Sequence, residues 1–200
     1  MKILVGTANP GKARELVELL AGTGIEVVSL RDVGLSAIEE TGTTFEENAL
    51  LKARTYAAAS GLPCLADDGG LEIDALDGAP GVYSHRWAGE QASDFDLAEK
   101  VIVSLADVPA DGRSARLRTV LAFTMPDGES LTVDRSIAGR IAMSYDRAKI
   151  QSGYPYRSLL IVDRYGKLFA DLTHEEHEAV NHRRAALREI LPTVIEMLKV

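Results

Sequence analysis

Short apolar segments alternate with stretches of helical periodicity along this chain, and this alternation constrains the fold more than any other feature. Four segments read as buried strands: 2–5, 25–30, 62–66 and 158–163. Between the first two, segment 11–21 places Leu16, Leu19 and Leu20 on one face of a helix. Alternating strands and helices are typical of the α/β class. The 200 residues, 46% of them hydrophobic, suit one domain or a single fold with two lobes.

Local signals predict further helices. Thr44 and Glu47 have capping-box spacing, and the apolar residues that follow recur every four positions, so we expect a helix that ends near Gly61. Segment 94–105 predicts another helix. A C-terminal helix is expected from about His182 to Leu198, and Pro192 should kink or divide it.

Turn residues predict a hairpin in the second half of the chain. Segments 114–125 and 130–137 alternate apolar and polar residues and are rich in Val, Leu and Thr, so we expect two strands joined at 126–129. The strand over 158–163 should turn at 165–167.

Two adjacent carboxylates follow one of the predicted strands. Asp67 and Asp68 come after Leu65-Ala66 and are followed by two glycines, so we expect an acidic turn between strands at 62–66 and 71–76. Burying neighbouring carboxylates is costly unless a cation neutralises them, and this favours a metal site. Taken alone, the pattern is also typical of a turn with solvated acids.

Other segments supply groups suited to phosphate and metal. Thr7, Asn9 and Lys12 lie where a strand is expected to turn into a helix, whose N-terminus presents backbone N–H groups to an anion. Glu40 offers a further carboxylate and Lys52 an ammonium group on the helix that follows. Each residue alone also fits a turn, a surface acid or a solvated helix charge. Their ordered combination favours a nucleotide phosphohydrolase.

Charge and composition exclude some partners. The net charge of −8 and pI near 5.1 argue against binding of extended nucleic acid, whereas a small polyanion is compatible if a metal and a few cations reverse the field locally. The single cysteine, Cys64, reads as a small core residue rather than a catalytic thiol. No segment resembles a signal peptide or a membrane span, so we expect a cytoplasmic protein with no membrane partner.

Five ordered motifs closely resemble those of the Ham1 or inosine triphosphate pyrophosphatase family. They lie at 7–15, 39–49, 66–71, 78–84 and 172–183 and so extend over almost the whole chain. The resemblance implies one domain over 1–200, with an elongated mixed β-sheet, flanking helices and two lobes around a central cleft. It also implies Mg²⁺-dependent hydrolysis of ITP, dITP and XTP to the monophosphate and pyrophosphate, by a protein that is usually a homodimer.

The resemblance also implies roles for individual residues. Asp68 matches the catalytic aspartate that orients or deprotonates the attacking water, and Asp67 would support it. Glu40 and Asp68 would hold Mg²⁺. The remaining positions would bind the nucleoside triphosphate: Thr7, Asn9, Lys12, Lys52, Gly69, Ser152, Gly153, Tyr154, His177, His182 and Arg183.

The segment expected to bind the base departs from the family's pattern. Ser152 and Pro155 stand where the family has a stacking phenylalanine and an aspartate, and His177 replaces a lysine. Near the phosphates, Gly69 replaces a serine and so removes a hydroxyl group. Loss of an aromatic stacking partner costs about 1–3 kcal/mol of binding, unless Tyr154, Tyr156 or Trp87 substitutes for it. Two alternatives therefore stand beside the pyrophosphatase: the same chemistry on another nucleotide, or a nucleotide-binding module without turnover.

Overall fold

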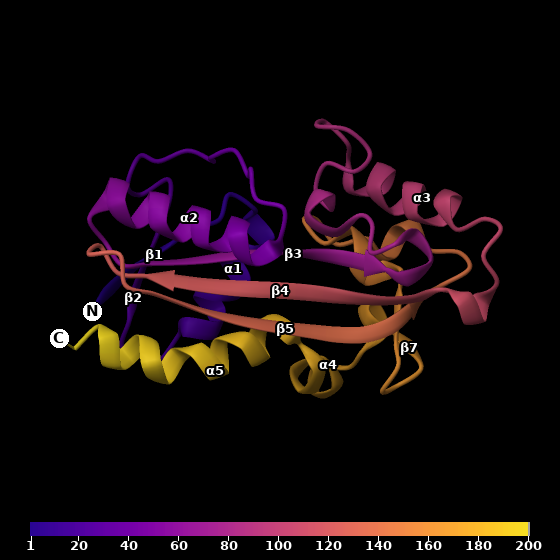
Figure 1. Cartoon of the computed structure of the whole chain (residues 1–200). Coiled ribbons are helices and arrows are strands. Elements are labelled where there is room, and N and C mark those ends of the chain that lie inside the picture. Colours follow the sequence, from indigo (N-terminus) through magenta and orange to yellow (C-terminus); the bar gives the residue numbers. More distant parts are fainter. Residues whose placement is uncertain (200) are drawn as a thin grey trace. The chain divides into compact units, whose positions relative to one another are not determined.

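The computed structural model describes residues 1–199 and has a mixed α/β fold. Its seven-stranded sheet has the order β2-β1-β3-β4-β5-β6-β7 (Figure 1). β1 runs parallel to β2 and β3, whereas β6 is antiparallel to β5 and β7. The strands are β1 (Lys2–Val5), β2 (Glu26–Ser29), β3 (Cys64–Ile73), β4 (Ser114–Thr124), β5 (Ser130–Ile141), β6 (Leu160–Val162) and β7 (Lys167–Leu168). The predicted α/β class and mixed sheet are confirmed.

Five α-helices accompany the sheet within the described residues. They are α1 (Pro10–Leu20), α2 (Phe45–Ser60), α3 (Asp94–Ser104), α4 (His174–Val180) and α5 (His182–Met197). α2 begins at the predicted capping box, since the Thr44 side chain accepts from the Glu47 amide and Glu47 accepts from the Thr44 amide. It ends at Gly61, whose φ of 69° is the left-handed conformation that suits glycine at a helix C-cap.

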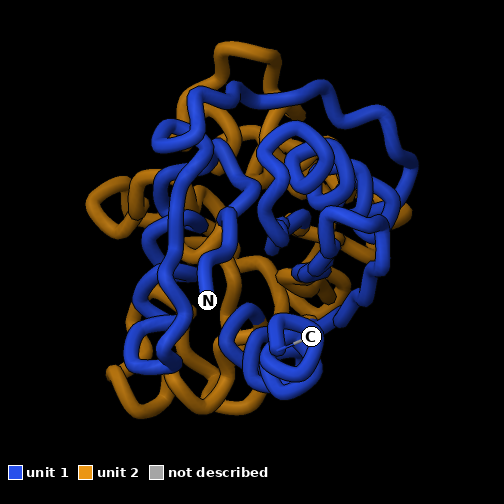
Figure 2. Tube along the Cα trace, turned by 90° about the vertical axis from the view of Figure 1, so that its left-hand side faces the viewer, with its two compact units in different colours: residues 1–68, 119–135, 183–200 blue, residues 69–118, 136–182 orange. Residues whose placement is uncertain are grey.

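The chain divides into two compact units (Figure 2). Unit 1 comprises residues 1–68, 119–135 and the described chain from 183 onward, and unit 2 comprises 69–118 and 136–182. The division falls within β3, between Asp68 and Gly69. Each unit has a hydrophobic core of its own.

In unit 1, apolar side chains of α1 and α5 pack against those of the central strands. Leu16 and Leu20 of α1 share a buried cluster with Ile190 and Val194 of α5 and with Ile3 of β1. α2 lies on the other side of these strands from α5 (Figure 1). The strands of unit 1 are therefore covered by helices on both faces.

In unit 2, α3 supplies one wall of the core. Its buried residues Leu97, Ala98 and Val101 recur at the spacing of one helix face and pack in a cluster with the strand residues Leu71 and Ile137. The turns and short strands after residue 155 pack into the same cluster. This core therefore ties the segment before β6 to α3.

The predicted acidic turn at residues 67–70 is wrong. β3 runs without interruption from Cys64 to Ile73, and neither Gly69 nor Gly70 has a positive φ. Gly70 is required for a different reason, because a Cβ there would lie 2.0 Å from Ser84 Oγ. Gly70 thus permits a close approach within unit 2.

Other boundaries differ less from the predictions. β5 continues to Ile141, four residues beyond the predicted strand end, and the strand expected at 158–163 is the shorter β6. The short helix α4 was not predicted, although Thr173 and Glu176 form a capping box at its start. Pro192 lies inside α5 and does not divide it.

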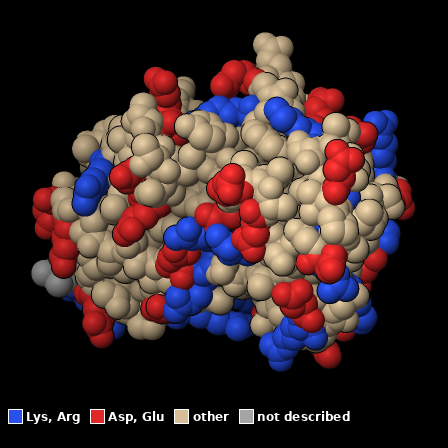
Figure 3. Space-filling model, turned by 45° about the vertical axis from the view of Figure 1, so that its right-hand side comes forward, with Lys and Arg blue, Asp and Glu red and all other residues tan. Residues whose placement is uncertain are grey.

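The surface and the single cysteine agree with the composition. Acidic and basic side chains are interspersed on the face drawn in Figure 3. Cys64 is fully buried, and burial raises the pKa of its thiol to about 12, as expected for a core residue. Among residues 1–199, no helix is both long and apolar enough to cross a bilayer.

Candidate active site

The loop between β1 and α1 is held by its own polar side chains. Asn9 is the N-cap of α1, and its Oδ1 accepts from the amides of Gly11 at 2.9 Å and Lys12 at 3.1 Å. Thr7 Oγ1 accepts from the Asn9 amide at 3.3 Å. Two backbone amides at the start of α1 are therefore already bonded to Asn9, as in the alternative reading of this segment as a turn. An anion would have to displace the Asn9 oxygen to reach them.

Asp67 is buried on β3 and anchors two cations. Lys12 Nζ lies 2.5 Å from Asp67 Oδ1, and Arg183 Nε lies 2.9 Å from Oδ2, to which the Thr119 hydroxyl also donates. Burial alone raises the pKa of this carboxyl, but the Arg183 and Lys12 charges outweigh burial and hold the pKa well below its usual range. Asp67 is therefore an anion whose oxygens are already engaged.

Arg183 connects this anchor to α1. Its Nη1 donates to Glu15 Oε2 at 2.7 Å while Nε contacts Asp67, so one guanidinium binds two carboxylates. The Arg183 side chain is only 4% exposed. Its position at the start of α5 is consequently fixed within unit 1.

Asp68, the next residue on β3, has a different environment. Lys52 Nζ of α2 lies 3.0 Å from Asp68 Oδ1 and 2.7 Å from Glu40 Oε1, so the ammonium bridges the two carboxylates. Burial raises the pKa of Asp68, and the Glu40 charge adds to that rise against the opposing effect of Lys52. Within residues 1–199, the buried Oδ2 of Asp68 has no hydrogen-bond partner.

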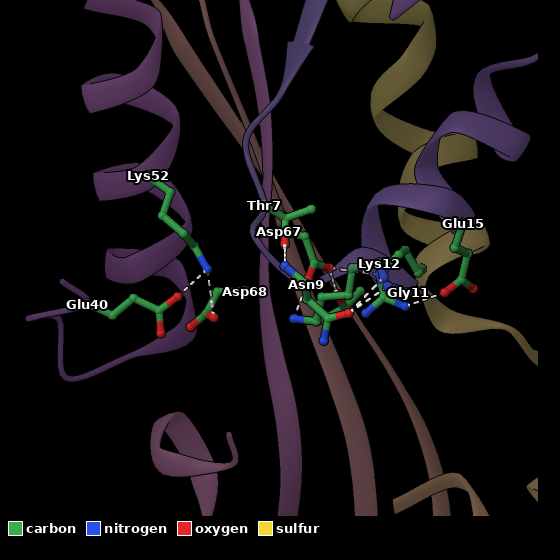
Figure 4. Close-up of polar contacts among 11 residues, drawn as sticks. Thr7, Asn9, Gly11, Lys12, Glu15, Glu40, Lys52, Asp67 and Asp68 are labelled. Atoms are coloured by element: carbon green, nitrogen blue, oxygen red, sulfur yellow. Dashed lines mark hydrogen bonds and ion pairs between the residues drawn. The ribbon is translucent and has the colours of Figure 1, made fainter. Parts of the chain in front are cut away.

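The two neighbouring carboxylates thus take opposite roles (Figure 4). Because side chains alternate along a strand, Asp67 reaches Lys12 of α1 while Asp68 reaches Lys52 of α2. Their pKa values move in opposite directions, which separates a permanently charged anchor from a group able to exchange a proton.

Charge in this cluster leaves room for a cation. Three cations face four carboxylates: Lys12, Lys52 and Arg183 against Glu15, Glu40, Asp67 and Asp68. The excess negative charge and the unpartnered Asp68 oxygen fit a hard divalent ion, which prefers oxygen ligands. No group of three or more His, Cys, Asp or Glu residues arranged for metal binding occurs in the described part of the chain. Glu40 and Asp68 would thus act as a pair.

The predicted base-binding residues, except Arg183, lie in unit 2. Ser152 is exposed, and Gly153 donates its amide to Asp94 Oδ2 at 2.8 Å. The Tyr154 ring lies 3.6 Å from the guanidinium carbon of Arg157, measured to the ring centroid. Gly69 directly follows Asp68 on β3.

The two histidines of this set have distinct surroundings. His177 of α4 contacts the Phe169 ring edge-on, with ring centroids 5.0 Å apart. His182, the first residue of α5, is buried.

Among the three aromatic substitutes considered for the missing phenylalanine, Tyr156 is committed to the core. It is buried, and its hydroxyl donates to the Ser84 carbonyl oxygen at 2.5 Å. Trp87 packs against the core of unit 2, and Lys100 Nζ lies 5.1 Å from its ring centroid. Tyr154 keeps part of its surface exposed.

Sequence reasoning assigned no role to three partners of the predicted site residues. Glu15 lies within the motif at 7–15 but carried no assigned function, and Thr119 lies in a predicted strand outside all five motifs. Arg157 gave no signal beyond its spacing of three residues from Tyr154. All three act through contacts that the fold creates.

The fold is of the mixed α/β class. Its charged cluster pairs two carboxylates of the central strand β3 with cations from α1, α2 and α5. The profile of the Ham1 family matches residues 3–193, and the chain belongs to this family.

Related proteins are similar in sequence to this chain over nearly its full length. The dITP/XTP pyrophosphatase of Yersinia pestis is 45% identical over 192 residues, which cover 95% of this chain and 96% of that protein. The dITP/XTP pyrophosphatase of Photorhabdus laumondii is 41% identical over 195 residues, covering 96% and 98%.

Solved structures are similar as well. A HAM1 protein from Coxiella burnetii superposes with a TM-score of 0.86 at 35% identity, covering 98% of this chain and 99% of that one. The nucleoside-triphosphatase, or dITP/XTP pyrophosphatase, of Mycobacterium abscessus has a TM-score of 0.77 at 40% identity, covering 96% and 100%. These similarities agree with the predicted family and fold.

Proposed function

We propose that this protein hydrolyses the non-canonical purine nucleotides ITP, dITP and XTP to the monophosphate and pyrophosphate. Relatives 41–45% identical over almost their whole length carry the name dITP/XTP pyrophosphatase. The observation that carries the proposal is the pair of adjacent carboxylates, because Asp67 is pinned as an anion while Asp68 keeps one buried oxygen without a partner.

Asp68 is the residue that acts on water. Its buried oxygen without a partner can accept a hydrogen bond, and then the proton, from the attacking water. Lys52 holds the other oxygen and so fixes the orientation of the carboxylate. Asp67 supports Asp68 indirectly, because it keeps Lys12 and Arg183 in place on the opposite face of β3.

Glu40 and Asp68 would hold Mg²⁺. The bound ion would neutralise phosphate charge and polarise the reacting phosphate. Lys12 and Lys52 would bind the triphosphate beside it, together with Thr7 and Asn9. Support for the lysines comes from their burial against carboxylates, which fixes the position of each ammonium before the substrate arrives.

The 6-oxo group of the base would be read by Arg183. A guanidinium donates to the 6-oxo group of hypoxanthine or xanthine, whereas the amino group of adenine presents another donor. Arg183 suits this task because two carboxylates fix its orientation. Gly69, Ser152, Gly153, Tyr154, His177 and His182 complete the proposed binding set.

Pyrophosphate release tests the proposal. We expect Mg²⁺-dependent release from ITP, dITP and XTP that exceeds release from GTP, ATP and dUTP, and its loss on addition of EDTA. Asp68→Asn should lower kcat by at least a hundredfold, because the amide cannot accept the proton. Asp127→Asn, in the exposed turn between β4 and β5, is the matched control and should leave kcat unchanged.

Two outcomes would contradict this assignment. Turnover confined to other nucleotides would favour the same chemistry on a different substrate, an alternative supported by Ser152 and the buried Pro155 where the family has Phe and Asp. Nucleotide binding without release of pyrophosphate would indicate a binding module instead.

The assembly is proposed from the family resemblance, and the location and the lack of a nucleic-acid partner are expectations of the sequence analysis. We infer a cytoplasmic homodimer in which residues 1–200 act as one domain, with no nucleic-acid partner. Light scattering coupled to size exclusion should give twice the 21.6 kDa chain mass. A monomer would contradict the dimer without affecting the proposed chemistry.

A further inference from the structure

The segment of unit 1 that carries Glu40 contacts α2 at every second residue. Residues 35–42 belong to no helix or strand of the described chain. Exposure alternates along this segment, because Ile38, Glu40 and Gly42 are half-buried and the residues between them are exposed. Such alternation is typical of a segment that lies along a surface with one side facing it.

Two side chains of α2 hold the first part of the segment. The buried Tyr56 hydroxyl accepts from the Ile38 amide and donates to the Ser36 carbonyl oxygen, both at 3.2 Å. One turn earlier on α2, Lys52 donates to Glu40 Oε1 at 2.7 Å. The backbone before Glu40 and the Glu40 carboxylate are therefore bound to the same helix.

Asn48 holds the end of the segment. Its Oδ1 accepts from the Gly42 amide at 2.7 Å, and a Cβ at Gly42 would lie 2.6 Å from that oxygen, so this close contact requires glycine. Asn48 is fully buried, and its Nδ2 has no hydrogen-bond partner within residues 1–199. A buried donor without a partner is destabilising, so stability alone does not explain an asparagine at this position.

The spacing of these contacts matches the geometry of the helix. Asn48, Lys52 and Tyr56 are four residues apart and so share one face of α2. Four helical residues advance about 6 Å, and two residues of extended chain advance about 6.6 Å. The segment can therefore run antiparallel to α2 and meet one side chain per turn. Glu40 makes the middle contact, with Lys52 between it and Asp68 (Figure 4).

We propose that Asn48 and Tyr56 are positioning residues for the proposed metal pair, which hold the segment 36–42 against α2 so that Glu40 stays beside Asp68. This inference rests on the proposed function, in which Glu40 and Asp68 hold Mg²⁺. It assigns to Asn48 and Tyr56 no contact with the substrate.

The backbone contacts do what Lys52 alone cannot. Lys52 contacts the Glu40 carboxylate itself, the group that would also bind the ion. Asn48 and Tyr56 contact backbone groups, so their hydrogen bonds do not depend on what the carboxylate binds. They can therefore hold the segment whether or not Glu40 has bound a metal ion.

Amide hydrogen exchange measured by NMR tests the contacts themselves. Tyr56→Phe keeps the ring and removes only the hydroxyl, so the Ile38 amide should exchange about tenfold faster or more. Asn48→Leu keeps much of the side-chain volume and should accelerate the Gly42 amide in the same way. Unchanged exchange of both amides would show that these contacts do not hold the segment, and would refute the inference.

Mn²⁺ binding followed by electron paramagnetic resonance tests the consequence for Glu40. We expect Tyr56→Phe and Asn48→Leu each to bind Mn²⁺ about tenfold more weakly, as is typical when a residue that orients a metal ligand is lost. The Mg²⁺ concentration for half-maximal pyrophosphate release should rise in parallel, while kcat at saturating Mg²⁺ changes less than about twofold. Should Asn48→Leu fail to fold by circular dichroism, Tyr56→Phe gives the deciding measurement.

Tyr145→Phe is the matched control. The Tyr145 hydroxyl donates to Glu99 of α3 at 2.9 Å, and both residues belong to unit 2. This variant also loses one bonded hydroxyl, yet it should leave Mn²⁺ affinity and kcat unchanged. An equal loss of Mn²⁺ affinity in Tyr145→Phe would mark a general structural defect and refute the inference.

Mn²⁺ binding requires no turnover, so it separates failure of this inference from failure of the proposed function. Weaker binding by both variants of a protein that releases no pyrophosphate would support the positioning role and refute the function. Unchanged Mn²⁺ affinity in either variant, together with release from ITP, would overturn the role of that residue and leave the function intact. Absence of Mn²⁺ binding by the unaltered protein would overturn the metal pair, and the inference with it.

Discussion

Asp67 and Asp68 differ by one position on β3, yet we expect their replacement by asparagine to lower stability by very different amounts. Asp67 is fully buried, forms an ion pair with Lys12 and accepts hydrogen bonds from Arg183 and Thr119. In Asp67→Asn the charge that both cations share is lost, and the new amide turns a donor toward one of them. Asp68 lies in a locally acidic group with Glu40, so its removal relieves repulsion as well as breaking a contact.

The magnitude follows from the contacts that remain. Removing one partner of a buried ion pair costs about 3–5 kcal/mol. Arg183 keeps Glu15, and the Lys12 side chain is 15% exposed and can turn to water, so we expect the lower limit, about 3 kcal/mol, for Asp67→Asn. For Asp68→Asn we expect less than about 1 kcal/mol, because Lys52 keeps Glu40.

Urea unfolding of both variants measures the difference. With a slope of about 2–3 kcal/mol per M, Asp67→Asn should lower the midpoint by about 1 M or more, whereas Asp68→Asn should change it by less than about 0.5 M. The double variant Asp67→Asn/Arg183→Met should lose less stability than the sum of its single changes, because the two residues contact each other. Equal midpoints for the two asparagine variants would refute the anchor role of Asp67.

Three further predictions concern residues outside the charged cluster. Gly70→Ala should lower the midpoint of thermal unfolding and the yield of folded protein, because the added Cβ would lie 2.0 Å from Ser84 Oγ; an unchanged midpoint would show that β3 yields at this position. The free energy of unfolding should fall as the pH rises above 9, by about 1.4 kcal/mol per pH unit, because the pKa of the Cys64 thiol is 9.0 in the unfolded chain and about 12 in the folded protein. In urea titrations, Cys64→Ala should lack this part of the pH dependence. Arg113→Lys should destabilise by about 3 kcal/mol in urea, because the fully buried guanidinium donates to the carbonyl oxygens of Leu105, Val108 and Ala142 and an ammonium cannot reach all three; a loss below 1 kcal/mol would contradict this.

Elements with local signals were predictable from the sequence. The start of α2 follows from the Thr44 and Glu47 pair, and its end from Gly61, since both signals act within one helical turn. α4 carries the same kind of signal at Thr173 and Glu176 and could have been found in the same way. The glycines of β3 misled the prediction, because glycine marks a turn or a close approach, and only the fold brings Ser84 against Gly70.

The residues of the candidate site were more predictable than the contacts among them. The sequence motifs identified Asp67, Asp68, Lys12, Lys52 and Glu40, which the fold brings together in unit 1. The motifs did not indicate which carboxylate would contact which cation, because Arg183 lies 116 positions from Asp67 along the chain. The contact between Tyr154 and Arg157 is local, since residues three apart eclipse each other in a 3₁₀ turn, but that turn was not recognised.

Because β3 runs unbroken through both acids, the site depends on the register of this strand. Side chains on a strand change face at every residue, so deleting a single residue between Cys64 and Asp67 would place the second carboxylate at the position of Asp67 and a glycine at the position of Asp68. A carboxylate would then still face Lys12 and Arg183, whereas Lys52 would face a glycine. A shift in the phase of this strand therefore keeps the anchoring acid and removes the acid proposed to act on water.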